Sequence, residues 1–253
     1  MDRSAFFAAL RRRDSGVFGT RLSQAQVEGT EALLDAAQWY GLQDPRHVAN
    51  SLAQTYHETG GYMLPIKETV FASHRDRNPS DATVIARLDR AWQEGQLPWV
   101  SRPYWRDGWF GRGQIQITHK ANYRKMGARL GIDLVGDPAK ALDPEISARI
   151  VVVGMAEGLF RAGHDLETYF DDETDDPHGA RRIVNGPDGT DSKVAGYHNA
   201  FLHGLRAGGW QLPADPGPVT PSPEDEIRDA DALLAYIAKL IADHKQITVA
   251  ARR

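Results

Sequence analysis

Gly-Arg-Gly-Gln-Ile-Gln-Ile-Thr, residues 111–118, is the stretch from which the fold can be worked out. Its last five residues alternate polar and apolar side chains, and strict alternation predicts a half-buried strand over 114–118. The two isoleucines are expected to face the core, while Gln114, Gln116 and Thr118 face the opposite side together. Such a row of polar side chains suits the wall of a polar cleft. A solvated outer face is the commoner outcome for the pentapeptide taken alone.

Aromatic and basic side chains surround this stretch. Trp99, Tyr104, Trp105 and Trp109 precede it closely. A sugar ring has an apolar face and hydroxyl edges, so aromatic rings beside amides are suited to binding sugars, although a place in the core is the alternative. Arg112, between two glycines, is able to approach a carboxylate and keep it ionised or oriented. The Gly-Arg-Gly sequence has too few glycines, and no following lysine, to bind a phosphate group.

Helical patterns are expected on both sides of this stretch. Two of them open with Asp-Pro, which places an aspartate at the cap and a proline at the first helical position. The helix after Asp143 is apolar nearly all round, which predicts a central buried helix. The expected helices begin at Ser23, Asp44, Asp143 and Asp191 or Ser192, and the first two end at Gly41 and at Gly60-Gly61.

Two glutamates near the end of the second expected helix are candidates for acid–base chemistry. Glu58 lies in the His-Glu-Thr-Gly-Gly sequence of residues 57–61, in the last helical turn, and Glu68 follows in a loop. The negative end of a helix dipole disfavours a charged carboxylate, so Glu58 is expected to hold a proton, whereas Glu68 is expected to stay ionised. Two carboxyl groups in different surroundings are the minimum requirement for glycoside hydrolysis. An ordinary exposed helix end is the alternative for Glu58, and His57 is a candidate to orient it.

The composition excludes several classes of protein. Hydrophobic residues make up 41% of the 253 residues and charged residues 25%, which is typical of a globular protein. A net charge of −4 gives no general attraction to nucleic acid. Without cysteine there is no disulfide, no thiol catalysis and no cysteine zinc site. No metal or cofactor is expected, because His57-Glu58 lacks a second histidine one helical turn later, and His198 and His203 are five residues apart.

The chain is expected to divide after residue 212. Residues 213–223 hold five prolines in eleven residues, which predicts a semi-rigid linker. Residues 224–253 carry apolar side chains at helical spacing and predict an amphipathic helix, which must dock on the first domain, on another chain or on a membrane surface. The tail is acidic, which favours docking or self-association over a membrane. No stretch resembles a secretion signal or a membrane span, so no stable membrane insertion is expected.

Taken together, these motifs resemble glycoside hydrolase family 19. The HETGG sequence, a second glutamate, WFGRGQIQIT, Asn122-Tyr123 and Asn185-Gly186 occur in the order seen in that family, and the similarity extends over roughly residues 45–205. The pattern G-R-G-x-I-Q-[IL]-[ST]-x(3)-N-Y is highly specific for it. The chain looks like the compact branch found in phage and prophage endolysins rather than like a plant chitinase.

The resemblance implies roles for individual residues. Glu58 matches the general acid, Glu68 the general base, and Thr118 the hydroxyl residue that helps to hold the attacking water. The chain departs from the plant pattern at Ala121 and at residues 187–189, so contacts with substrate on that side are not carried over. The other residues expected to bind or support the substrate are Gln116, Asn122, Asn185, Tyr123, Arg112 and His57.

The fold implied by the resemblance is mainly α: a lysozyme-like α+β domain over residues 1–212, with a small β-hairpin lining a substrate cleft. The implied function is that of an endolysin, which hydrolyses β-1,4 glycosidic bonds of bacterial peptidoglycan by an inverting mechanism without metal or cofactor. Chitin is the alternative substrate, and a non-catalytic glycan-binding or virion protein is the alternative function. The expected location is the cytoplasm of the producing cell, with action on the wall after another protein has permeabilised the membrane.

Overall fold

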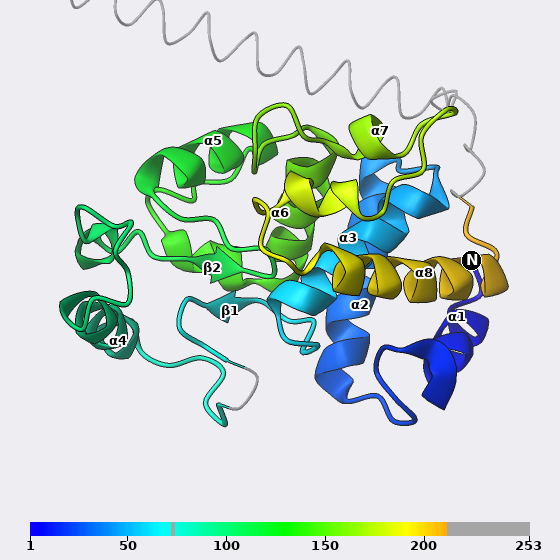
Figure 1. Cartoon of the computed structure of the whole chain (residues 1–253), viewed down its shortest axis with the longest axis horizontal. Helices are drawn as coiled ribbons and strands as arrows, with labels where there is room; N and C mark the ends of the chain where they lie inside the picture. The colour runs from blue at the N-terminus through cyan, green and yellow to red at the C-terminus, as the bar shows by residue number, and fades with distance from the viewer. Residues whose placement is uncertain (72–73, 212–253) are drawn as a thin grey trace, which may run out of the picture. The chain divides into compact units, whose positions relative to one another are not determined.

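The computed structural model describes residues 1–71 and 74–211, which form a mainly helical unit with one small antiparallel sheet (Figure 1). The prediction of a mainly α fold with a small antiparallel sheet is confirmed, but the two strands are separated by α4 (Asp81–Gln93) in the sequence and do not form a hairpin. The chain divides into two units after Leu212. The linker predicted at 213–223 and the helix predicted at 224–253 lie outside the described residues. Within the described part, no helix combines the length and the apolar character needed to cross a bilayer.

The four helices predicted from the sequence are α2 (Gln24–Tyr40), α3 (Pro45–Glu58), α6 (Pro144–Ala156) and α8 (Asp191–Ala207). Ser23 caps α2 in a reciprocal arrangement with Gln26, and Gly41 ends it in the left-handed conformation with φ of 90°. The carboxylates of Asp44 and Asp143 cap α3 and α6 by accepting backbone N–H groups of the first turn. Local capping chemistry therefore explains where these helices begin.

The sequence patterns did not predict the other elements. These are helices α1 (Arg3–Leu10), α4 (Asp81–Gln93), α5 (Lys120–Leu130) and α7 (Leu166–Tyr169), strands β1 (Ile66–Lys67) and β2 (Arg112–Gly113), and the 3-10 helices Arg13–Ser15, Tyr104–Asp107, Pro138–Leu142 and Gly179–Ile183.

The small sheet joins two segments that are far apart in the sequence. β1 pairs antiparallel with β2, so that Lys67 lies opposite Arg112. Both side chains are buried and reach Asp81 at the start of α4, with distances of 2.8 Å from the ammonium and 2.9 Å from the guanidinium to the carboxylate. Burial raises the pKa of Asp81, but the two cations lower it by more, so this pKa lies below its usual value. This charged cluster attaches α4 to the sheet.

The prediction of a strand over 114–118 is wrong, because the chain turns there. Residues 114–116 form a turn that Arg112 and Ile117 close with two backbone hydrogen bonds of 3.1 and 3.3 Å. Gly113 has φ of 125°, and a Cβ added there would lie 2.8 Å from a backbone oxygen, so the turn requires glycine. The alternation of polar and apolar residues therefore comes from a tight turn and not from a pleated strand.

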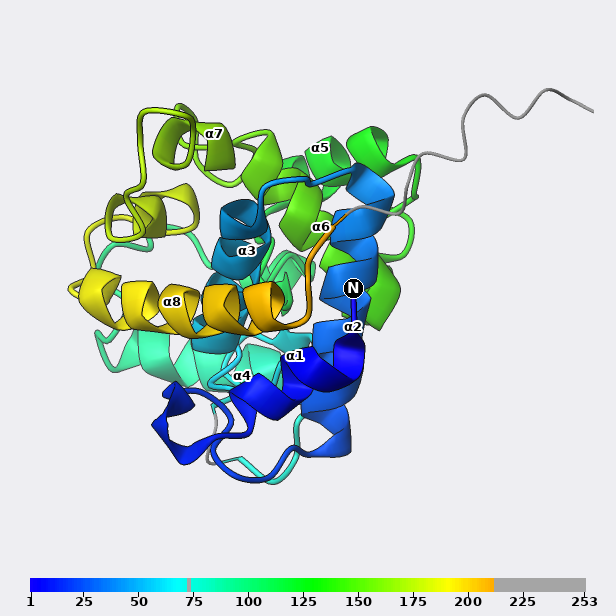
Figure 2. The same ribbon diagram turned by 90° about the vertical axis from the view of Figure 1, so that its right-hand side faces the viewer.

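The main core is built around α6, where eight of thirteen residues are buried, as the sequence predicts for a central helix. α2 packs on α6, α3 packs on α8, and α1 lies beside α8 (Figure 2). A separate, smaller apolar cluster lies between α4 and the 3-10 helix that follows it (Figure 1, left). Its buried members are Val84, Leu88, Trp105 and Phe110.

Candidate active site

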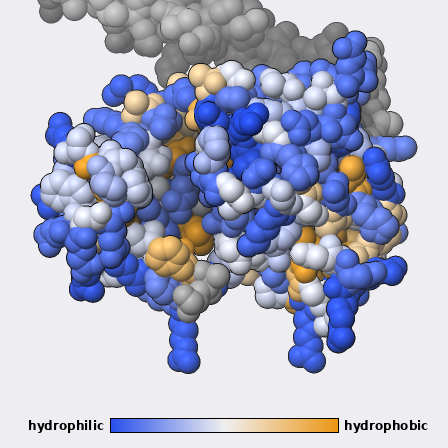
Figure 3. All heavy atoms as spheres, in the orientation of Figure 1, coloured by the Kyte–Doolittle hydropathy of each residue, from blue (hydrophilic) through white to orange (hydrophobic). Residues whose placement is uncertain are grey.

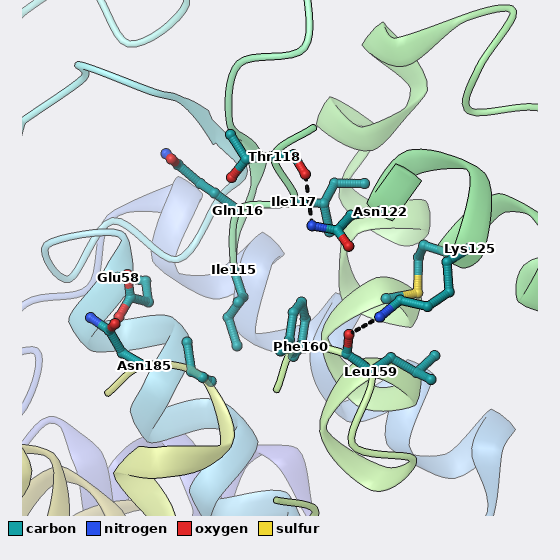
Figure 4. A pocket seen from close by; sticks show the side chains of 12 residues that line it. Glu58, Ile115, Gln116, Ile117, Thr118, Asn122, Lys125, Leu159, Phe160 and Asn185 are labelled. Carbon is teal, nitrogen blue, oxygen red and sulfur yellow. Dashed lines mark hydrogen bonds between the residues drawn. The ribbon is translucent and has the colours of Figure 1, made fainter. Parts of the chain in front are cut away.

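One cavity of about 300 Å³ brings together most of the residues that the sequence singled out (Figure 4). Glu58, Gln116, Thr118, Asn122 and Asn185 line it. In the space-filling view, apolar atoms show at the bottom of a depression with a hydrophilic rim, between the left-hand lobe and the rest of the molecule (Figure 3). The remaining lining residues of the cavity are Lys125 and the apolar Ile115, Ile117, Met126, Leu159, Phe160 and Val184.

Glu58 is the last residue of α3, as predicted, and its side chain is 27% exposed. Its Oε1 lies 2.7 Å from Nη1 of Arg181, an ion pair that the sequence did not predict. The two groups are close but not aligned for a hydrogen bond, and Oε1 is buried without a hydrogen-bond partner. Arg181 therefore places a positive charge beside the carboxyl group at the C-terminal end of α3.

Arg181 is the centre of a buried charged cluster beside the cavity. Its guanidinium donates to Oε1 of Gln54 at 2.8 Å and to Oδ2 of Asp188 at 2.6 Å. Burial raises the pKa of Asp188, but hydrogen bonds from Arg181 and Thr190 lower it by more, so this pKa lies well below its usual value. Asp188 also accepts a hydrogen bond of 3.1 Å from the amide of Asn185. The cluster thus fixes Asn185 on the same arginine that pairs with the acid at the end of α3.

Glu68 follows β1 and accepts two hydrogen bonds. The hydroxyl of Tyr104 donates to Oε1 at 2.8 Å, and the backbone N–H of Gly111 donates to Oε2 at 2.8 Å. These two donors hold both oxygens of the Glu68 carboxylate in place. Burial and the charge of Glu68 raise the pKa of Tyr104, so the phenol remains a donor at neutral pH. Glu68 is not among the residues that line the cavity, and its partners are different from those of Glu58.

Gln116 and Thr118 face the cavity from the turn, and Asn122 faces it from α5 (Figure 4). The amide of Asn122 donates to the backbone oxygen of Thr118 at 2.8 Å, which links α5 to the turn. The side chain of Gln116 packs directly on Gly111, where any Cβ would collide with it. Gly111 therefore lets Gln116 lie against the peptide whose N–H binds Glu68.

Gln114 does not share the side of Gln116 and Thr118, contrary to the prediction. It is fully buried, and its amide donates to the backbone oxygen of Met63 at 2.5 Å. A turn does not keep the two-residue period of a strand, which is why this glutamine points inward. The prediction that Ile115 and Ile117 are buried is confirmed, with exposures of 2% and 3%.

Arg112 and Tyr123 lie behind the turn and do not line the cavity. Arg112 is 3% exposed, and its guanidinium donates to the Tyr123 hydroxyl at 3.1 Å and to Asp81 at 2.9 Å. Burial raises the pKa of Tyr123 to about 12, and its hydroxyl donates to the backbone oxygen of Phe110 at 2.8 Å. Arg112 does approach a carboxylate, as expected, but the carboxylate is that of Asp81 at the start of α4 and not that of either candidate catalytic glutamate. Arg112 and Tyr123 both support the turn.

His57 is half-buried next to Glu58. Burial, with a contribution from Arg181, lowers the pKa of His57, so its ring is neutral at pH 7. No hydrogen bond joins the His57 ring to Glu58, so the predicted orienting role has no direct contact to support it. Within residues 1–71 and 74–211, no group of three His, Asp or Glu side chains is arranged to hold a metal ion.

Sequence reasoning missed Arg181, Asp188 and Lys125. Lys125 follows Asn122 by three residues, a spacing that places both on one helix face, so this signal was available. Arg181 has no such signal, because the adjacent Arg182 is chemically identical. Tyr104 was singled out as an aromatic residue suited to binding sugars, but in the structure its hydroxyl donates a hydrogen bond to Glu68.

Comparison with known proteins gives a partial match over the first part of the site. Residues 41–156 match the family model of chitinase class I (Glyco_hydro_19). Endochitinase 1 of Theobroma cacao is 33% identical over 108 residues, which cover 40% of this chain and 30% of that protein. Endochitinase B of Nicotiana tabacum is 34% identical over 109 residues, with the same coverage of 40% and 30%. The chain thus spans about 30% of the length of these curated relatives.

Among solved structures, chitinase C from Streptomyces griseus HUT6037 aligns with a TM-score of 0.46 and 19% identity, covering 85% of this chain and 78% of that chain. The matched family segment includes both glutamates and the cavity residues of the turn and α5. Asn185 and Arg181 lie beyond it.

Proposed function

We propose that this chain, whose residues 41–156 match glycoside hydrolase family 19 (chitinase class I), is a glycoside hydrolase that cleaves β-1,4 bonds between N-acetylhexosamine units. The observation that carries the proposal is a pair of glutamates held in contrasting surroundings. Glu58 reaches the cavity with a buried oxygen that receives no hydrogen bond, whereas the carboxylate of Glu68 accepts two hydrogen bonds. The family match and the names of the relatives support the same reaction class.

In this mechanism Glu58 protonates the leaving oxygen, and Glu68 removes a proton from the attacking water. The hydroxyl of Thr118 lies in the cavity, where it is available to orient the water. An inverting enzyme needs roughly 6.5–9.5 Å between its carboxyl groups.

The cavity lining suits a sugar that carries an acetamido group. The side-chain amides of Gln116, Asn122 and Asn185 provide donors and acceptors for hydroxyl and acetamido groups. Ile115 and Phe160 provide apolar surface for a methyl group or a ring face. We propose bacterial peptidoglycan, cleaved in the manner of an endolysin, as the substrate. Chitin shares the N-acetylglucosamine unit and is the second candidate, favoured by the names of the relatives.

The test is a comparison of wild type with Glu58→Gln and Glu68→Gln on purified cell walls and on chitin oligosaccharides. Mass spectrometry of the products identifies the bond that is cut, and early NMR spectra give the anomeric configuration. We expect inverted products from wild type, no cleavage by Glu58→Gln and a severe loss for Glu68→Gln. Retained configuration would contradict the inverting mechanism. Binding without cleavage by wild type would favour the glycan-binding alternative.

Two sequence expectations continue as proposals. We propose that the enzyme stays in the cytoplasm of the producing cell until another protein permeabilises the membrane, so expression alone should not lyse cells until a permeabilising agent is added. We also propose self-association through residues 224–253. Light scattering on the full chain and on a chain ending at Gln211 tests this, and equal protomer numbers would contradict it.

A further inference from the structure

Lys125 occupies the end of the cavity opposite Glu58 (Figure 4). Its ammonium donates to the backbone oxygen of Leu159 at 2.5 Å and forms no ion pair with any residue that the structure describes. An ammonium has three donor hydrogens, so two are left for a ligand. Lys125 is exposed and shares a face of α5 with the cavity residue Asn122.

A second cation, Arg161, follows the cavity residue Phe160 but does not itself line the cavity. The guanidinium of Arg161 donates to the backbone oxygens of Asn185 at 3.2 Å and Arg182 at 3.3 Å. Like Lys125, it has no carboxylate partner in residues 1–71 and 74–211. The cation beside Glu58 differs, because Glu58 and Asp188 neutralise Arg181. At the Glu58 end of the cavity, the charge of Arg181 is therefore balanced by two carboxylates. At the other end, the charge of Lys125 makes the cavity positive.

We propose that the positive end binds a carboxylate of the substrate and that Lys125 gives the enzyme a preference for acidic glycans over neutral ones. The inference rests on the proposed function and makes its substrate class specific. Chitin is uncharged, so it offers this ammonium hydrogen-bond acceptors but no ion pair. In peptidoglycan, alternate sugars carry a lactyl ether that ends in a carboxylate or continues into a peptide bearing carboxylates. An exposed lysine attracts such a group without having to bury its charge.

The test uses Lys125→Met, which removes the charge and keeps an apolar stem, and Lys125→Arg, which keeps the charge. Lys120→Met is the matched control, since Lys120 is also exposed on α5 but lies over Trp109 and outside the cavity lining. The substrates are peptide-bearing glycan strands, peptide-free strands with free lactyl carboxylates, the same strands after amidation, and neutral N-acetylglucosamine oligosaccharides.

We expect the ratio of kcat/KM on acidic to neutral substrates to fall roughly three- to fivefold in Lys125→Met, as for an exposed ion pair. Lys125→Arg and Lys120→Met should keep the wild-type ratio. Amidation should remove the difference between wild type and Lys125→Met, and added salt should reduce it. A loss confined to peptide-free strands identifies the lactyl carboxylate, and a loss confined to peptide-bearing strands identifies a peptide carboxylate.

An unchanged ratio, or equal losses on acidic and neutral substrates, would overturn the inference, because Lys125 would then act only through its contact with Leu159. Calorimetric binding of the same glycans to Glu58→Gln and to the double variant with Lys125→Met separates this result from a failure of the proposed function. Absence of hydrolysis by the wild-type protein would refute the proposed glycoside hydrolase activity. A binding difference limited to acidic glycans would still support the role of Lys125, and its absence would refute that role.

Discussion

Arg181 binds four side chains that come from two distant parts of the chain, namely Gln54, Glu58, Asp188 and Thr190. Arg181→Met should lower the free energy of unfolding by about 1–3 kcal/mol, because it leaves two carboxylates and an amide without their cation. The carboxylates are 27% and 25% exposed, so water replaces part of the loss. Urea denaturation measures the effect. The exposed neighbour provides the control, since Arg182→Met should change stability by no more than about 0.5 kcal/mol.

Thr118 is predicted to act on the water and not on the fold. Thr118→Val keeps the shape of the side chain and removes the hydroxyl, so turnover should fall by about tenfold, the value of one hydrogen bond in the transition state. The melting temperature should stay nearly the same. Ile117→Ala provides the contrast: at 3% exposure it should cost about 2–5 kcal/mol of stability. A stable Ile117→Ala beside an unfolded Thr118→Val would contradict this division of roles.

At the scale of elements, two helical glycines predict opposite effects of the same substitution. Gly154 in α6 lies against the ring of Phe160, and an added Cβ would collide with that ring. Gly154→Ala should therefore cost about 1–3 kcal/mol and raise KM, because Phe160 lines the cavity. Gly196 in α8 has open space around it, so Gly196→Ala should stabilise the protein by up to about 1 kcal/mol through helix propensity. Thermal unfolding of both variants measures the change in stability, and steady-state kinetics measures KM. Stability changes of the same sign in the two variants would contradict the packing argument.

At the scale of the whole molecule, one buried histidine makes stability depend on pH. His198 of α8 is 1% exposed, stacks on Phe170 at 5.0 Å, and has no hydrogen-bond partner at either ring nitrogen. Burial, with a contribution from Arg46, lowers its pKa from 6.5 to about 4. Between these values the unfolded chain binds a proton that the folded protein does not. The free energy of unfolding should therefore fall as the pH drops from 6.5 to 4, by up to about 3 kcal/mol.

His198→Leu removes this titration and should flatten the dependence of unfolding free energy on pH over the same window. His203→Leu, on the same helix but exposed, should leave the slope as in wild type. Urea denaturation at several pH values gives both slopes. Equal slopes for wild type and His198→Leu would show that other groups cause the acid sensitivity.

Features that depend on neighbouring residues could be predicted from the sequence. Ser23, Asp44 and Asp143 identified the starts of α2, α3 and α6, because capping involves backbone groups only two or three residues away. The position of Glu58 in the last turn of α3 followed from the same local logic. The motif around Gln116 and the family resemblance were enough to select most of the polar residues that line the cavity.

Only the tertiary structure decided which partners those residues have. Arg181 and Arg182 are equivalent in the sequence, but one is buried against Glu58 and the other is exposed, since burial depends on the packing of the 3-10 helix and not on residue type. Gln114 and Gln116 look equivalent as well, and the turn after Gly113 sends one into the core and the other into the cavity. The sequence did not show which carboxylate Arg112 would bind. Its partner is Asp81, because the pairing of β1 with β2 places Arg112 next to the start of α4. These outcomes depend on long-range contacts, which local sequence patterns do not encode.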